Sequence, residues 1–216
     1  MRDSIVDAET ESGPTVTPNG PDTLRELLDE FESLVQAQGS PVKNQLGVGL
    51  DRGTIVQQLT GIGIEPPEEL VVWFGWHNGL AAPAGGRLRG DALPPCIIPS
   101  TLNKAIGRYY RDKDADHGEG PWDSAPGWLM LSNTTSGLAI FCSDDPDNPP
   151  RIRSVDMDHP LWEVESTQQV VSLCTAVSYW IRALELGVHS WNRATEKWDY
   201  DPSRIPPLLL RSGLVT

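Results

Sequence analysis

Two long segments with helical hydrophobic periodicity constrain the fold of this 216-residue chain most strongly. In the first, apolar residues recur at spacings that place them on one face of a helix. They are Leu24, Leu27, Leu28, Phe31, Leu34 and Val35. Thr23 and Glu26 predict a capping box at its start, and Gly39 and Pro41 predict its end. The second segment, at about residues 167–186, has the same periodicity. Its predicted inward residues are Val170, Leu173, Cys174, Val177, Ile181 and Leu184.

The residues between these two helices show shorter helical and extended patterns. Helices are predicted around Ile55–Leu59, within residues 65–79 and after Ser100. Two apolar runs around a polar turn in residues 128–143 predict a hairpin, and the alternation in residues 151–156 predicts a half-buried strand. Helices that flank a block of consecutive strands are typical of the α+β class, here with a mostly antiparallel central sheet.

The chain divides into three predicted regions. Residues 1–21 are polar, acidic and interrupted by proline and glycine, so we expect a flexible N-terminal arm. Residues 22–190 hold the predicted helices and strands and form a single domain. Residues 191–216 are predicted to be an irregular tail, in which Trp191 and Trp198 are candidate anchors onto the domain.

Charge and composition exclude several classes of protein. The net charge of −13 opposes nonspecific binding to nucleic acid or to an anionic membrane, because both need clustered Lys and Arg. It favours a positively charged protein partner, although acidic charge also serves solubility alone. Cys96, Cys142 and Cys174 are far apart, which is typical of a reducing compartment and of neither a disulfide framework nor a zinc site. With no long apolar run and no secretory leader, we expect a cytoplasmic protein.

The segment Trp73–Gly79, WFGWHNG, is either a reactive site or the closing turn of a buried helix. Trp73, Phe74 and His77 fall on one side of a helix, and no carboxylate lies near His77 in sequence on that face. We therefore interpret His77 as a packed or capping residue whose ring nitrogens bond locally. Asn78–Gly79 is interpreted as a left-handed helix exit. On this interpretation the segment closes a core.

The order of these features resembles the SUKH superfamily, which includes the fungal Smi/Knr cell-wall regulators and many bacterial immunity proteins. The resemblance covers roughly residues 22–190, from the first amphipathic helix through WFGWHNG and a hairpin with a Gly-Trp opening to the last helix. Its motif residues are Trp73, Trp76, His77, Asn78, Gly79, Gly127 and Trp128. Residues 80–96 and 111–126 are longer than the family minimum, and the tail after Gly187 is not part of the pattern.

The resemblance implies a binding protein and not an enzyme. Bacterial members of the superfamily are commonly immunity proteins that neutralise a cognate toxin, often a nuclease or deaminase with a basic surface. A chain with this negative charge suits such a partner, because it can occupy the surface that nucleic acid otherwise takes. The alternative is a regulatory scaffold of the Smi/Knr type without a toxin partner. The sequence leaves the oligomeric state open.

Two acidic segments are candidate contacts for a basic partner. They comprise Asp112, Asp114 and Asp116 with Trp122 nearby, and Asp144, Asp145 and Asp147. Residues 112–123 have the length of an EF-hand calcium loop, but the sixth residue is His117 in place of Gly and the twelfth is Asp123 in place of Glu. A solvated loop is favoured, and we predict no metal and no cofactor. A metal-dependent hydrolase that uses these loops remains as a third alternative.

Overall fold

The computed structural model describes residues 6–10, 13–16, 20–80, 93–94, 97–114, 128–132, 136–142, 151–156 and 172–205. The helices in these ranges are α1 (Pro21–Ala37), α2 (Arg52–Thr60), α3 (Glu68–Trp76), α4 (Leu102–Asp114) and α5 (Leu173–Glu185), with two short 3₁₀ helices, η1 (Pro41–Gln45) and η2 (Pro202–Arg204). The strands are β1 (Val6–Thr10), β2 (Gly13–Val16), β3 (Leu46–Val48), β4 (His77–Leu80), β5 (Trp128–Met130), β6 (Ser136–Phe141), β7 (Arg151–Asp156), β8 (His189–Asn192) and β9 (Lys197–Tyr200).

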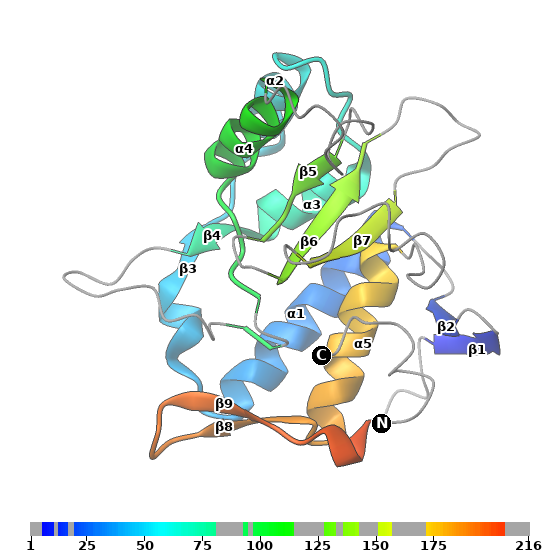
Figure 1. Cartoon of the computed structure of the whole chain (residues 1–216), viewed down its shortest axis with the longest axis vertical. Coiled ribbons are helices and arrows are strands. Elements are labelled where there is room, and N and C mark those ends of the chain that lie inside the picture. Colours follow the sequence, from blue (N-terminus) through cyan, green and yellow to red (C-terminus); the bar gives the residue numbers. More distant parts are fainter. Residues whose placement is uncertain are drawn as a thin grey trace.

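The centre of the molecule is the pair α1 and α5, which lie side by side and run in the same direction (Figure 1). The predicted apolar stripe of α1 is confirmed, because its residues are buried except for the partly buried Leu34. The ring of Phe31 in α1 packs against the ring of Trp180 in α5, with 5.7 Å between ring centroids. Two amphipathic helices thus bury their apolar faces against each other, which supplies the core that neither could form alone.

The starts of both long helices differ from the prediction. α1 begins at Pro21 after Gly20, whose carbonyl accepts the first helical hydrogen bond from the Leu24 amide, so Thr23 lies inside the helix and the predicted capping box is wrong. Proline is favoured in a first turn because its missing N–H would have no partner there. α5 begins at Leu173, and its cap is Ser172, whose hydroxyl accepts from the Thr175 amide. Residues 167–171 of the predicted helix lie outside the described residues.

The three-stranded sheet has the order β5–β6–β7, and both strand pairs are antiparallel. The predicted hairpin and the predicted strand at residues 151–156 are therefore confirmed. Leu129 pairs with Ile140, which pairs in turn with Ile152, and the first two side chains are buried. The sheet contacts α4 through β5 and α5 through β7. Helices packed on a small antiparallel sheet make this an α+β protein, as the sequence predicted.

Residues 189–200 form a hairpin, so the prediction of an irregular tail is wrong for this part of residues 191–216, and residues 206–216 lie outside the described residues. β8 and β9 pair antiparallel, with Trp191 opposite Trp198, and the Trp198 side chain packs against the core as an anchor. Figure 1 shows this hairpin across the C-terminal ends of α1 and α5. The sequence feature that could have predicted this hairpin is the placement of ring side chains at every second position in HSWN and KWDY, which is typical of paired strands.

Two arginine side chains lie close to the glycines that follow α1 and α5. A Cβ atom added at Gly39, just after α1, would lie 2.9 Å from Nη2 of Arg193, and one at Gly187, after α5, would lie 2.6 Å from Nη1 of Arg204. Both glycines have positive φ angles, 88° and 69°, which end the helices in the left-handed conformation. A guanidinium group beside a helix C-terminus also interacts favourably with the negative end of the helix dipole.

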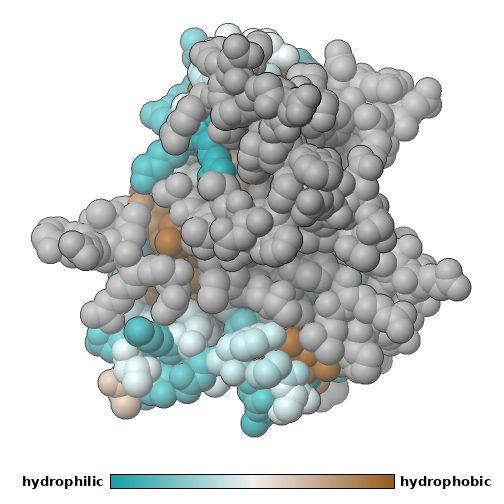
Figure 2. All heavy atoms as spheres, viewed as in Figure 1, coloured by the Kyte–Doolittle hydropathy of each residue, from teal (hydrophilic) through white to brown (hydrophobic). Residues whose placement is uncertain are grey.

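The N-terminal arm contains structure as well. β1 and β2 form an antiparallel pair, and β2 contacts α5, so the expected flexible arm holds two paired strands. Among the described residues, no helix has the length and apolar character that crossing a bilayer requires. Figure 2 shows that the described surface on this side is mostly hydrophilic, with hydrophobic side chains gathered beside β3 and β4. Val48 of β3 is 89% exposed.

Candidate functional site

The heptapeptide Trp73–Gly79 spans the junction between α3 and β4. The helix ends at Trp76, and His77 is extended, with φ −147° and ψ 137°. The left-handed residue is Gly79, with φ 76°, and it lies within β4 and not at the helix exit, so the predicted exit at Asn78–Gly79 is wrong. The side-chain oxygen of Asn78 accepts a hydrogen bond from the Leu102 amide at 2.8 Å and so caps the start of α4.

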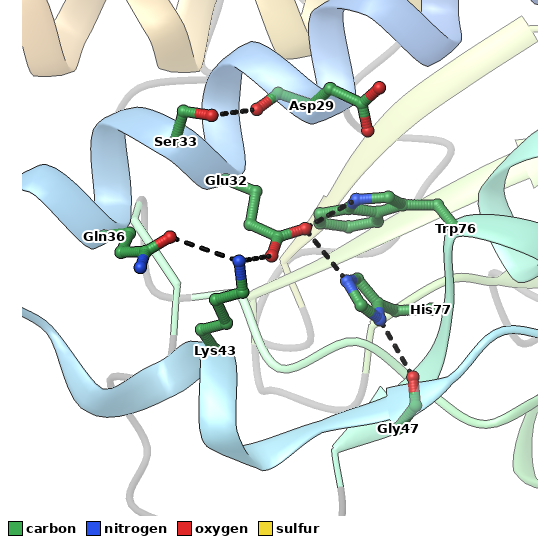
Figure 3. A network of polar contacts seen from close by, with 8 residues as sticks. All are labelled: Asp29, Glu32, Ser33, Gln36, Lys43, Gly47, Trp76 and His77. Atoms are coloured by element: carbon green, nitrogen blue, oxygen red, sulfur yellow. Dashed lines mark hydrogen bonds and ion pairs between the residues drawn. The ribbon is translucent and has the colours of Figure 1, made fainter.

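The imidazole of His77 lies between two acceptors from distant segments (Figure 3). Its Nδ1 lies 2.9 Å from the carbonyl oxygen of Gly47 in β3, 30 positions away. Its Nε2 lies 3.1 Å from Oε2 of Glu32 in α1, 45 positions away. Both side chains are largely hidden from solvent, with 19% of His77 and 17% of Glu32 exposed. One ring therefore joins β4, β3 and α1.

The carboxylate of Glu32 collects further donors. The indole Nε1 of Trp76 donates to Oε2 at 3.3 Å, and the Lys43 ammonium lies 3.3 Å from Oε1 while it also donates to Gln36. Burial raises the pKa of Glu32, but hydrogen bonds and charge from His77 and Lys43 outweigh it and hold the pKa below its ordinary value. Glu32 is therefore ionised at neutral pH. We call Glu32, Lys43, Gly47, Trp76 and His77 the Glu32–His77 network.

This network corrects the interpretation of the heptapeptide. Trp73 and Phe74 are buried as predicted, and Trp73 packs against Trp180. His77 does not bond locally, however, because both its partners come from other elements. The carboxylate that sequence inspection did not find near His77 is supplied by α1. The segment thus closes the core on one side and makes a polar connection on the other.

The network holds its histidine in place and leaves neither ring nitrogen open. A general base or metal ligand needs a nitrogen lone pair that faces the substrate or ion, and both nitrogens of His77 face protein acceptors. The described cysteines are also poor nucleophiles, because burial raises the pKa of the Cys142 thiol to about 12 and raises that of Cys174 as well. This arrangement connects three segments of the chain through the contacts of one imidazole ring.

Only some of the predicted acidic contact residues lie among the described residues. The backbones of Asp112 and Asp114 lie in the last turns of α4, so the prediction of a loop is wrong for residues 111–114, and residues 115–126 lie outside the described residues. An EF-hand loop from Asp112 is therefore wrong, because its first three positions are helical. Trp128 is the first residue of β5. The remaining candidates lie outside the described residues: Asp116, Trp122, Gly127, Asp144, Asp145 and Asp147.

A different acidic surface stands out among the described side chains. α1 carries one basic residue, Arg25, and five acidic residues: Asp22, Glu26, Asp29, Glu30 and Glu32. Asp22, Glu26 and Asp29 are exposed, and Glu30 is partly exposed. The charged side chains described elsewhere divide evenly between acidic and basic. The excess negative charge of the described side chains therefore lies on α1, which the sequence analysis had used only as a source of core residues.

No protein-family model matches this chain, and no curated protein matches it either. Within the described ranges, no three His, Cys, Asp or Glu side chains are grouped so that they could share a metal ion. The candidate site is thus defined by its geometry: the acidic outer face of α1, and the Glu32–His77 network that ties the same helix to β3 and β4.

Proposed function

We propose that this chain is a SUKH-like protein-binding domain that acts without catalysis, as a bacterial immunity protein against a basic toxin that acts on nucleic acid. The observation that carries the proposal is the concentration of negative charge on α1. This helix is buried along one side and presents Asp22, Glu26 and Asp29 to solvent along the other. A rigid helix with carboxylates at helical spacing is a suitable surface for Lys and Arg side chains that otherwise bind phosphate.

The proposed mechanism is occlusion. A toxin that binds nucleic acid must expose cationic groups, and an acidic protein can cover them without reproducing the shape of the nucleic acid. The charge of the whole chain, −13, would raise the rate of encounter with such a partner. Most of this long-range attraction is screened at high salt. We therefore expect an association rate that falls steeply with ionic strength.

The test is direct binding to any toxin domain encoded next to this gene, with calorimetry to measure affinity and a nuclease or deaminase assay to measure inhibition. The wild-type chain should bind at micromolar concentration or below and should inhibit. A charge-reversed α1, Asp22→Lys with Asp29→Lys, should bind at least tenfold more weakly, because both side chains are exposed and lie on the face proposed to bind. Circular dichroism would show that the variant is folded.

The matched control is Glu65→Lys with Asp199→Lys, which also changes two exposed carboxylates to ammonium groups, one before α3 and one on β9, both outside α1. Its affinity should stay close to that of wild type. Equal losses from the control and the α1 variant would remove α1 as the contact face. Failure of the wild-type chain to bind any of these toxin domains would contradict the immunity function and would favour the scaffold of the Smi/Knr type.

A further inference from the structure

The segment at residues 46–50, LGVGL, alternates apolar residues with glycine along β3 and just beyond it. Both glycines lie against the backbone that joins α3 to β4. A Cβ atom added at Gly47 would lie 2.7 Å from the carbonyl oxygen of Asn78. One added at Gly49 would lie 1.9 Å from the carbonyl oxygen of Gly75. The close approach of the two backbones therefore fixes the position of this segment.

Val48, between these two glycines, contributes little to the core. Its side chain is 89% exposed, whereas the other exposed large apolar side chains in the described ranges reach only 44% and 45%. Leu46 and Leu50 on either side are partly buried against the core. We call Leu46, Val48 and Leu50 the β3 patch, which lies in the hydrophobic area beside β3 and β4 in Figure 2. An exposed apolar patch with a polar rim is typical of a protein-binding surface, and a fixed backbone lowers the entropy lost on binding.

The Glu32–His77 network places the β3 patch beside α1. Val48 pairs with His77 across β3 and β4, and residues opposite each other in an antiparallel pair project from the same face. The His77 ring reaches the Glu32 carboxylate of α1 at 3.1 Å (Figure 3). Asp29, which is exposed, precedes Glu32 by three positions and so lies on the same flank of the helix. The β3 patch and the acidic face of α1 are thus neighbouring parts of one surface.

We propose that the β3 patch and the acidic face of α1 form one docking surface for a basic protein that presents an apolar side chain flanked by Lys or Arg. The basic class of the partner rests on the proposed function, and its apolar side chain is inferred from the exposure of Val48. The carboxylates attract the partner over a distance, and the β3 patch supplies the contact from which water is excluded. A second copy of this chain suits the surface less well, because a two-fold interface brings like-charged α1 helices together.

The test uses two synthetic peptides as probes, one of alternating Lys and Leu and one of alternating Lys and Ser, with calorimetry on the full chain at low salt. Wild type should bind the Lys–Leu peptide more tightly. Val48→Thr, which keeps the branched shape, should weaken binding of this peptide about fivefold, because an apolar contact is lost. It should leave binding of the Lys–Ser peptide unchanged. Val56→Thr, the same substitution at a partly buried position of α2, is the matched control and should keep the preference of wild type.

The proposal is overturned if wild type does not prefer the Lys–Leu peptide, or if Val48→Thr binds it as tightly as wild type does. A dimer of wild type in sedimentation that Val48→Thr abolishes would assign the β3 patch to a second copy and would also overturn it. Asp22→Lys with Asp29→Lys should weaken binding of both peptides, and unchanged binding would remove the acidic face from the surface. The peptides report on the surface without a toxin, so failure of toxin binding would contradict the immunity function alone.

Discussion

Glu32 in α1 and Glu69 in α3 are both removed from full solvent contact, yet their pKa values shift in opposite directions. Burial raises the pKa of both carboxyl groups. At Glu32 this effect is outweighed by hydrogen bonds and charge from His77 and Lys43. At Glu69 burial prevails, because the described partner is a single backbone amide, that of Leu173, at 3.4 Å. The number and charge of the hydrogen-bond donors therefore determine whether the pKa of a buried carboxyl group is raised or lowered, and the depth of burial alone does not.

Glu32 and Glu69 show that a partly buried carboxyl group can have two different structural roles. Glu32 joins segments that are far apart in sequence and is stabilised in its charged form by the contacts that it makes. Glu69 lies at the start of α3 and reaches the start of α5, where its charge is costly. Substitutions that remove the contacts of Glu32 should destabilise the protein, and substitutions that neutralise Glu69 should not.

The largest effect is expected from Gly49→Ala. This substitution should displace the backbone next to β3, which carries Gly47 of the Glu32–His77 network. A Cβ atom at this position would lie 1.9 Å from the carbonyl oxygen of Gly75 in α3, so β3 or α3 must move. We expect a loss of about 3 kcal/mol in the free energy of unfolding, measured by urea denaturation. Gly107→Ala in α4 is the control, because a Cβ atom there meets nothing within 4 Å. An equal effect at both positions would contradict the close approach.

The next effect is expected from Glu32→Ala, which leaves the Trp76 indole, the His77 ring and the Lys43 ammonium without their common acceptor. The loss should be about 2 kcal/mol, since partly buried donors are left unpaired. Glu30→Ala, on the same helix and partly exposed, should cost less than about 0.5 kcal/mol. If the two substitutions had similar effects in thermal and urea unfolding, the network would be a surface contact of little energetic weight.

The third prediction concerns stability in acid. The pKa of Glu32 is lowered by folding, so its contribution is present above its unfolded pKa and is lost as the pH falls through the folded value. Wild type should therefore lose stability between about pH 5 and pH 3 more steeply than Glu32→Gln. Urea midpoints across this range measure both slopes. Parallel slopes would mean that the carboxylate gains nothing from its partners on folding.

The smallest effect is expected from Glu69→Gln. The pKa of Glu69 is raised by folding, so its contribution is present below the unfolded pKa and is lost as the pH rises through the folded value. An amide oxygen can still accept from the Leu173 amide without a buried charge, so stability at pH 7 should rise by up to about 1 kcal/mol. Glu68→Gln removes an exposed ion pair with Arg52 and should not stabilise. A clear destabilisation at Glu69 would show that its charge is needed.

The sequence predicted the elements of this fold better than their ends. The periodicity of α1 and α5 and the alternation of β7 identified those elements, and in α1 the apolar residues are buried along one face, as the periodicity predicts. The predicted starts of α1 and α5 were wrong, because several nearby residues could serve as the N-cap of each helix. Gly20 and Ser172 occupy the N-cap positions of α1 and α5.

The Glu32–His77 network could not be derived from the sequence. Its members come from α1, η1, β3, α3 and β4, and no local pattern relates positions 45 residues apart. One signal was present: Glu32 lies beside the buried Phe31 on a helix whose outer face carries other acids, and a partly buried carboxylate requires a donor. That signal predicts a partner but does not identify it.

The position of β8 and β9 across the C-terminal ends of α1 and α5 has a consequence for biosynthesis. α1 leaves the ribosome long before α5, which covers its apolar side, and before Arg193, which approaches Gly39. Contacts between such distant positions form late, because the intervening chain must first be synthesised and closed into a loop. The apolar residues of nascent α1 therefore stay exposed until α5 has been synthesised, and a chaperone that shields such segments should raise the yield of native protein.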